Sequence, residues 1–111
     1  ILLQTKTLIL TPRYLVELSD DICAIIPLPE VLWIYDHAAM RRTIKGRQLS
    51  YTIHVVTMKG EEYTLTGKSH REVSAIYHEL NTRYPNFFFG YSKEHQEMVQ
   101  YVLHEMKNEK A

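Results

Sequence analysis

Four cationic side chains lie within seven positions of one another: Arg41, Arg42, Lys45 and Arg47. No acidic residue occurs anywhere between residues 37 and 60, so the local sequence leaves this charge uncompensated. A guanidinium group donates two parallel hydrogen bonds to two oxygens of a phosphate, and lysine adds a compact positive charge. The cluster is therefore a candidate site for the phosphate of a lipid headgroup, a nucleotide or RNA. Two other interpretations stay open: the hydrated tip of a hairpin, where cations discourage strand pairing, and a contact for a protein partner.

The histidines do not show the spacing of a metal site. The zinc-binding pattern HExxH fails because Thr82 and Asn108 occupy its fifth position after His78 and His104. A single cysteine cannot supply the paired thiolates of a structural zinc site. We expect no metal and no cofactor. The six histidines are His37, His54, His70, His78, His95 and His104.

Signatures of catalysis are missing as well. The nucleophile motif Gly-x-Ser-x-Gly and the glycine-rich dinucleotide motif do not occur. Gly67, Lys68 and Ser69 resemble the end of a phosphate-binding P-loop, but Glu62 stands where the upstream glycine is required. We therefore interpret this stretch as the beginning of a helix, and we expect that the protein is not an enzyme.

The length, composition and net charge of the chain limit the class of protein to which it can belong. A chain of 111 residues with 45% hydrophobic residues is long enough for one folded domain with its own core. Thirteen basic residues balance thirteen acidic ones, so no global charge favours nucleic acid, and none is expected as a partner. Cys23 has no partner for a disulfide and apolar neighbours, which predicts a buried thiol and a reducing, cytoplasmic location. The chain begins inside an apolar stretch without methionine, which suggests a piece of a longer protein. The alternative location is the cytoplasmic part of a membrane-associated protein.

Residues 5–66 predict a succession of short strands joined mostly by tight turns. Residues 51–56 alternate in the period of two that marks a half-buried strand, and Lys59-Gly60 predicts the turn that follows. Pro27-Leu28-Pro29 is stiff and predicts a corner. Such succession is typical of antiparallel pairing. The expected strands are 5–11, 14–19, 22–26, 30–36, 49–58 and 61–66, with a seventh considered at 86–90.

The period then changes to that of helices. Ser69 and Glu72 have the spacing of a capping box, and an apolar stripe follows over about 70–84. Ser92 predicts the cap of a second helix over about 93–107. The expected class is α+β, with a strongly twisted antiparallel sheet or partly open barrel of six to seven strands followed by two C-terminal helices.

This order resembles the bacterial pleckstrin-homology-like domains of membrane-associated proteins. The resemblance rests on "LILTPRYLVELS" (8–19) and "IIPLPEVLWIY" (25–35), and it extends over roughly residues 5–84. It implies a scaffold that binds proteins, lipids or peptides. The second helix departs from the usual plan, which ends with one helix.

Two aromatic residues are candidates for contact with a partner. Phe88 lies in a run of three phenylalanines that cannot all face one side of a strand, and Trp33 alternates with Val31 and Tyr35. Burial in the core is the alternative for both residues. Together, these observations predict a non-enzymatic binding or scaffolding module with a protein partner. The alternative is binding to an anionic ligand or membrane surface through residues 41–47, and a homodimer is compatible with either.

Overall fold

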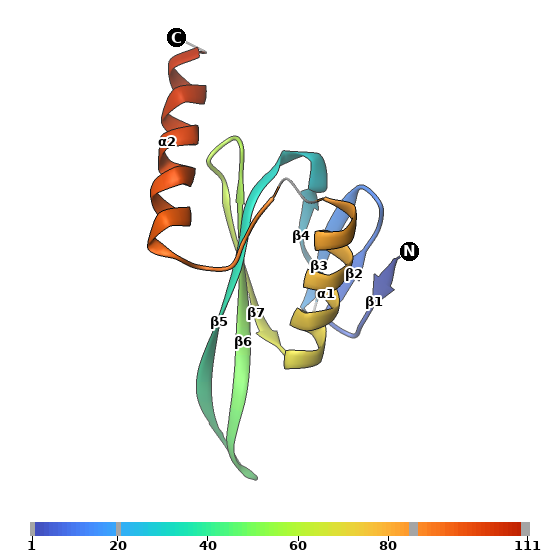
Figure 1. Ribbon diagram of the computed structural model, residues 1–111. Helices are drawn as coiled ribbons and strands as arrows, with labels where there is room; N and C mark the ends of the chain where they lie inside the picture. The colour runs from blue at the N-terminus through green and yellow to red at the C-terminus, as the bar shows by residue number, and fades with distance from the viewer. Residues whose placement is uncertain (1, 20, 85–86, 110–111) are drawn as a thin grey trace.

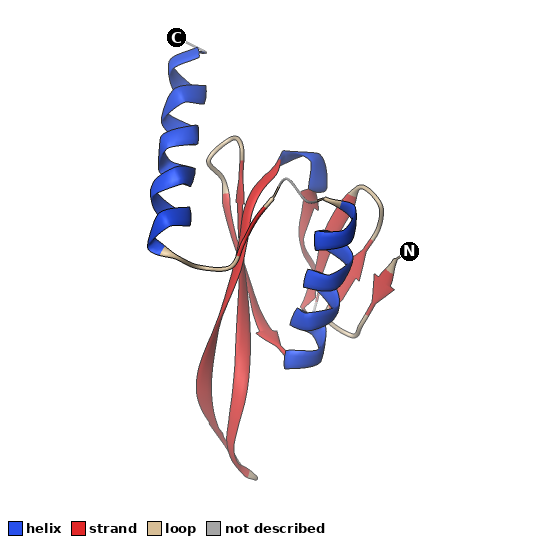
Figure 2. Ribbon diagram, viewed as in Figure 1, coloured by secondary structure: helices blue, strands red, loops and turns tan. Residues whose placement is uncertain are grey.

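The computed structural model describes residues 2–19, 21–84 and 87–109; a few side chains within these ranges, including Cys23 and Arg41, lie outside the description. The fold is α+β: two four-stranded sheets are followed by two helices (Figure 1; Figure 2). The expected fold class and both C-terminal helices are confirmed. The described strands form two open sheets and no closed barrel.

The first sheet is an antiparallel meander in the order β1-β2-β3-β4. Its inward side chains, among them Leu8, Leu10, Leu15 and Ile26, are at most 1% exposed and form one side of the main core. Burial of alternate apolar residues is what sets the register of such a sheet. Its strands are β1 (Leu3–Gln4), β2 (Leu8–Leu10), β3 (Tyr14–Ser19) and β4 (Asp21–Pro27).

A short 3-10 helix, η1 (Leu28–Glu30), joins the two sheets at the corner that the prolines predict. Leu28 is fully buried, and its backbone N–H donates to the carbonyl of Arg13 at 2.8 Å. The carbonyl of Glu30 accepts from the N–H of Met58 at 2.7 Å. The corner is therefore held from both sheets, and the chain leaves it in a new direction.

The second sheet has the order β7-β6-β5-β8. Its first three strands are antiparallel, whereas β8 pairs with β5 in parallel, Trp33 opposite Phe88. Ile34, Ile53, Val55 and Leu65 face the main core. The strands are β5 (Val31–Thr43), β6 (Gly46–Thr57), β7 (Glu62–Lys68) and β8 (Phe88–Phe89).

Helix α1 (His70–Arg83) covers the main core with Val73, Ile76 and Leu80. The predicted capping box is present: the Ser69 hydroxyl accepts from the backbone N–H of Glu72 at 3.1 Å, and the Glu72 carboxylate accepts from the N–H of Ser69 at 3.1 Å. These bonds satisfy amides that have no partner within the helix.

Helix α2 (Lys93–Glu109) packs on a second, smaller cluster. Val99 lies there with Leu32, Trp33 and Val56, all less than 7% exposed. In Figure 1, α2 stands apart from α1 and runs upward past the β6–β7 turn. The second helix therefore adds a small core of its own next to the main one.

Candidate functional site: the β5–β6 arm

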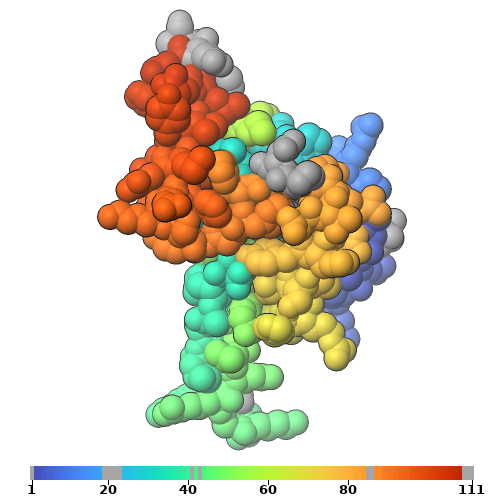
Figure 3. Space-filling view, in the orientation of Figure 1, coloured from blue at the N-terminus to red at the C-terminus, as the bar shows by residue number. Residues whose placement is uncertain are grey.

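The second sheet extends into a two-stranded arm, residues 38–50, that projects from the rounded body (Figure 3). The β5–β6 pairing continues to Thr43 and Gly46, so Ile44 and Lys45 alone form the turn. Gly46 has a φ of 120°, which residues with a side chain rarely adopt, and this explains the glycine. The basic segment, expected as a loop, is therefore mostly strand, because a two-residue turn lets the pairing reach the tip.

Apolar side chains are exposed at and beside the tip of the arm. Ile44 in the turn has a relative exposure of 107%, and Met40 and Leu49 on the strands are 60% and 51% exposed. Cations are interspersed with these residues, so the tip is both apolar and positive. The cations with described, exposed side chains are Arg42, Lys45 and Arg47.

The structure brings most of the predicted cation cluster together at the tip. A hollow of about 630 Å³ is lined by Ile44, Lys45, Arg47 and Gln48. The side chain of the fourth predicted cation, Arg41, lies outside the described residues. Sequence reasoning identified the charges but missed the exposed Ile44. Its position between Thr43 and Lys45, in the middle of a polar turn, was the available signal.

Both edges of the arm lack a neighbouring strand among the strands described. On one side β7 pairs with β6 only from Tyr51 onward, and on the other β8 pairs with β5 only at Trp33 and Ile34. The last bond on the β8 side runs from the N–H of Gly90 to the carbonyl of Ile34, at 2.9 Å. A two-stranded ribbon without further support is marginal in water. The arm would therefore gain stability from a contact.

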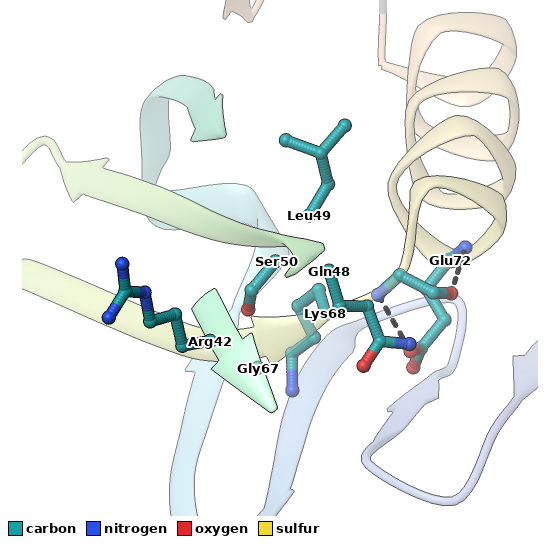
Figure 4. Close-up of a pocket in the computed structure, with 8 residues that line it drawn as sticks. Arg42, Gln48, Leu49, Ser50, Gly67, Lys68 and Glu72 are labelled. Carbon is teal, nitrogen blue, oxygen red and sulfur yellow. Dashed lines mark hydrogen bonds between the residues drawn. The ribbon is translucent and has the colours of Figure 1, made fainter. Parts of the chain in front are cut away.

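Where the arm joins the body, a depression of about 360 Å³ separates it from the beginning of α1 (Figure 4). The arm contributes Arg42, Gln48, Leu49 and Ser50, and α1 contributes Glu72. Figure 4 shows Arg42 and Glu72 on opposite sides of the depression. Its polar groups are mixed in charge, so it has no clear preference for an anion.

The Glu72 carboxylate links α1 to the segment between β1 and β2 of the first sheet. Its Oε2 accepts from the hydroxyls of Thr5 and Thr7, each at 2.6 Å. Burial acts to raise the pKa of Glu72, but the hydrogen bonds from Thr5, Thr7 and Ser69 outweigh it and lower the pKa. The capping residue found in the sequence thus also holds distant threonines.

Lys68, in the stretch that resembles a P-loop, is buried rather than presented to a ligand. Its Nζ donates to Glu17 Oε1 at 2.7 Å and to the Thr7 carbonyl at 3.2 Å. The side chains of Lys68 and Glu17 are 0% and 5% exposed. This ion pair joins β7 of the second sheet to β3 of the first. A local sequence pattern could not predict this ion pair, because Lys68 and Glu17 are 51 residues apart.

A second long-range hydrogen bond joins β5, next to the arm, to α1. The Tyr77 hydroxyl donates to Asp36 Oδ1 at 2.5 Å. Burial raises the pKa of Tyr77, and the hydrogen bond to Asp36 and its negative charge raise it further. Asp36 lies on β5 two residues before the arm, on the edge that has no neighbouring described strand beyond Ile34.

The two aromatic candidates for partner contact lie against α2. Trp33 is 5% exposed, and its Nε1 donates to the Gly90 carbonyl at 2.9 Å. Phe88 is partly buried against the smaller cluster and lies beside His95, with ring centroids 5.4 Å apart. The structure thus gives these residues a packing role, the alternative considered from the sequence.

A row of rings continues from Trp33 along the face of the sheet opposite α1. Tyr35 lies 4.2 Å from Trp33 and 4.7 Å from His54, measured between ring centroids. His54 Nε2 and His37 Nδ1 are 2.8 Å apart and share a hydrogen bond. Burial and the neighbouring His37 lower the pKa of His54. Over the described residues, no group of three or more potential metal ligands occurs.

A family model described as a domain of unknown function, DUF6709, matches residues 5–99. The chain belongs to this family. The match includes every strand from β2 onward, the whole arm, α1 and the first seven residues of α2. No curated protein and no solved structure matches the chain. In the described part of the chain, neither helix combines the length and the apolar character needed to cross a membrane.

Proposed function

We propose that this domain is a non-enzymatic binding module that attaches to anionic membrane surfaces through the tip of its arm. The observation that carries the proposal is the fully exposed Ile44 in the turn, next to Lys45 and close to Arg42 and Arg47. Because Ile44 is fully exposed, it adds nothing to the packed core of the described residues. In a lipid interface it would be buried while the cations meet the headgroups.

The magnitudes are suited to reversible attachment. Each cation near an anionic surface contributes about 1 kcal/mol, so Arg42, Lys45 and Arg47 together contribute about 3 kcal/mol. Burial of the Ile44 side chain adds roughly 1.5–3 kcal/mol. Cytoplasmic leaflets carry the anionic lipids, in keeping with the cytoplasmic location proposed from the sequence. The resemblance to pleckstrin-homology-like domains, which bind lipids, proteins and peptides, supports a binding role.

The test is sedimentation with vesicles of neutral lipid and vesicles containing an anionic lipid, at low and at physiological salt. Binding is expected only with the anionic vesicles, and it should weaken with salt because screening shortens the range of surface charges. Ile44→Ser should lower the partition constant by about tenfold or more. Replacing Arg42, Lys45 and Arg47 by serine should lower it by about 100-fold.

Matched control variants distinguish the effect of the arm from the effects of overall charge and of overall surface hydrophobicity. A variant with Lys6, Arg13 and Arg71 changed to serine loses the same charge from exposed positions outside the arm. Ile25→Ser removes an isoleucine that is 53% exposed on β4. Both controls should bind as the unaltered domain does. Equal losses in controls and arm variants would contradict the proposal, as would arm-dependent binding to duplex DNA without binding to vesicles.

A second candidate function is binding of a protein segment that adds a strand to the arm. The specific observation is that β8 stops at Phe89, which leaves the β5 edge beyond Ile34 without a partner among the described strands. Strand addition gives affinity through main-chain hydrogen bonds. Amide hydrogen exchange measures whether the backbone N–H groups of this edge are hydrogen-bonded. Fast exchange at Asp36, Ala38 and Met40, slowed when a partner is present, is expected; fast exchange unaffected by any partner would contradict this candidate.

A further inference from the structure

The direction of the backbone along the β5 edge follows from one hydrogen bond. The Ile34 carbonyl points away from β6, because it accepts from Gly90 on the β8 side. From Ile34 to Thr43 the pairing of β5 with β6 has no shift in register. In an antiparallel strand the N–H and C=O of alternate residues point to the same side. The free edge therefore presents the N–H and C=O of Asp36, Ala38, Met40 and Arg42.

Charges on this edge make it complementary to itself. If a second copy runs antiparallel with Ala39 opposite Ala39, then Asp36 faces Arg42 of the other copy, and Ala38 faces Met40. Each facing pair consists of residues whose N–H and C=O already point outward, as hydrogen-bonded pairs require. Asp36 and Arg42 also lie on the same face of β5, since they are six residues apart.

The two charged groups are available for this contact. The Tyr77 hydroxyl occupies only Oδ1 of Asp36. Over the described residues, the second oxygen of Asp36 has no partner, and Arg42 forms no ion pair. The side chains at the centre, Ala38 and Ala39, are small and exposed, so they do not hinder the approach of another backbone. Opposite charges facing each other across strands stabilise such a pair.

We propose that the arm pairs with the arm of a second copy along residues 36–42, in the register that places Ala39 opposite Ala39. This inference rests on the second candidate function, strand addition, and names its partner; membrane attachment by the tip does not depend on it. The contact is a two-fold interface in which both copies use the same edge. It is short compared with a standard interface, so a weak dimer is expected, with dissociation on the order of 10–100 μM.

Cysteine scanning tests the register directly. The background is Cys23→Ser, which leaves no other thiol in the chain. Ala39→Cys places two thiols across a pair without hydrogen bonds, where the β-carbons are close enough for a disulfide. Under mild oxidation at about 100 μM protein, Ala39→Cys should form a disulfide-linked dimer within the time in which Ala38→Cys and Met40→Cys remain monomeric. Cross-linking strongest at Ala38→Cys or Met40→Cys would overturn this register.

Sedimentation velocity tests the interface without cross-links or vesicles. Ala38→Pro removes an N–H from the free edge but none from the β5–β6 ladder, so the domain should stay folded and become monomeric. Arg42→Glu should weaken the dimer at least tenfold, because acids then face each other. A folded domain that is monomeric at several hundred μM without either change would overturn the proposal. Vesicle binding retained by Ala38→Pro would show that the tip functions separately.

Discussion

The buried ion pair between Glu17 and Lys68 gives the sharpest test of how the two sheets are joined. Lys68→Met removes the cation and keeps most of the side-chain volume. Glu17 Oε1 then loses the donor that now stands at 2.7 Å, while Glu17 Oε2 already has no partner in the described structure. The Thr7 carbonyl keeps one donor, the N–H of Leu18 at 2.9 Å. The main consequence is therefore a carboxylate that is buried and unpaired.

Breaking a buried pair in this manner typically costs about 3–5 kcal/mol. Domains of this size are stable by about 5–15 kcal/mol, so Lys68→Met should leave a marginal fold. Replacing both residues, Glu17→Leu with Lys68→Met, removes both charges from the core. That change should be close to neutral or stabilising, because neither desolvation penalty remains. The single and double variants together should therefore give a coupling of about 3 kcal/mol or more.

The assay is equilibrium unfolding in urea, followed by circular dichroism and by the fluorescence of Trp33, the single tryptophan. Agreement of the two signals establishes that the transition is two-state. Lys59→Met is the matched control. Its ion pair with Glu30, at 3.0 Å, has side chains that are 57% and 34% exposed, so solvent screens it and its loss should leave the unfolding midpoint almost unchanged. A loss below about 1 kcal/mol for Lys68→Met, or strict additivity in the double variant, would refute the reasoning.

Two further predictions concern groups whose pKa is shifted by the fold. Glu72→Gln should cost about 1 kcal/mol at neutral pH, because a neutral amide is a weaker acceptor for Thr5, Thr7 and Ser69. Since the pKa of Glu72 is lowered in the folded state, its stabilisation is present above the unfolded value of about 4.3 and is lost as the pH falls below it. Urea unfolding from pH 7 to pH 3 should show the two proteins converging at low pH; a constant difference would contradict this. Tyr77→Phe should cost about 1–2 kcal/mol, because Asp36 loses its donor. The pKa of Tyr77 is raised, so stability should fall above about pH 10, where the unfolded tyrosine ionises first. Absorbance titration should show one of the eight tyrosines ionising only on unfolding, a step absent in Tyr77→Phe; simultaneous ionisation of all eight in the folded protein would argue against the buried bond.

Residues close together in the sequence determined the parts of the fold that could be predicted. The alternation at 51–56 placed β6, and the proline-rich corner became η1. The capping box of Ser69 and Glu72 placed the beginning of α1. These features depend on hydrogen bonds and side-chain periods within a few residues, so a local pattern contains the information that forms them.

The tertiary structure alone decided which distant segments meet. It paired Lys68 with Glu17, placed β8 in parallel beside β5, and divided the strands into two sheets. It also made the cation cluster part of an arm and left Ile44 exposed at its tip. The sequence by itself determined the charges of residues 41–47. Whether they lie on a loop or on a ribbon with free edges depends on where neighbouring strands end, and that is set by packing between segments far apart in the chain.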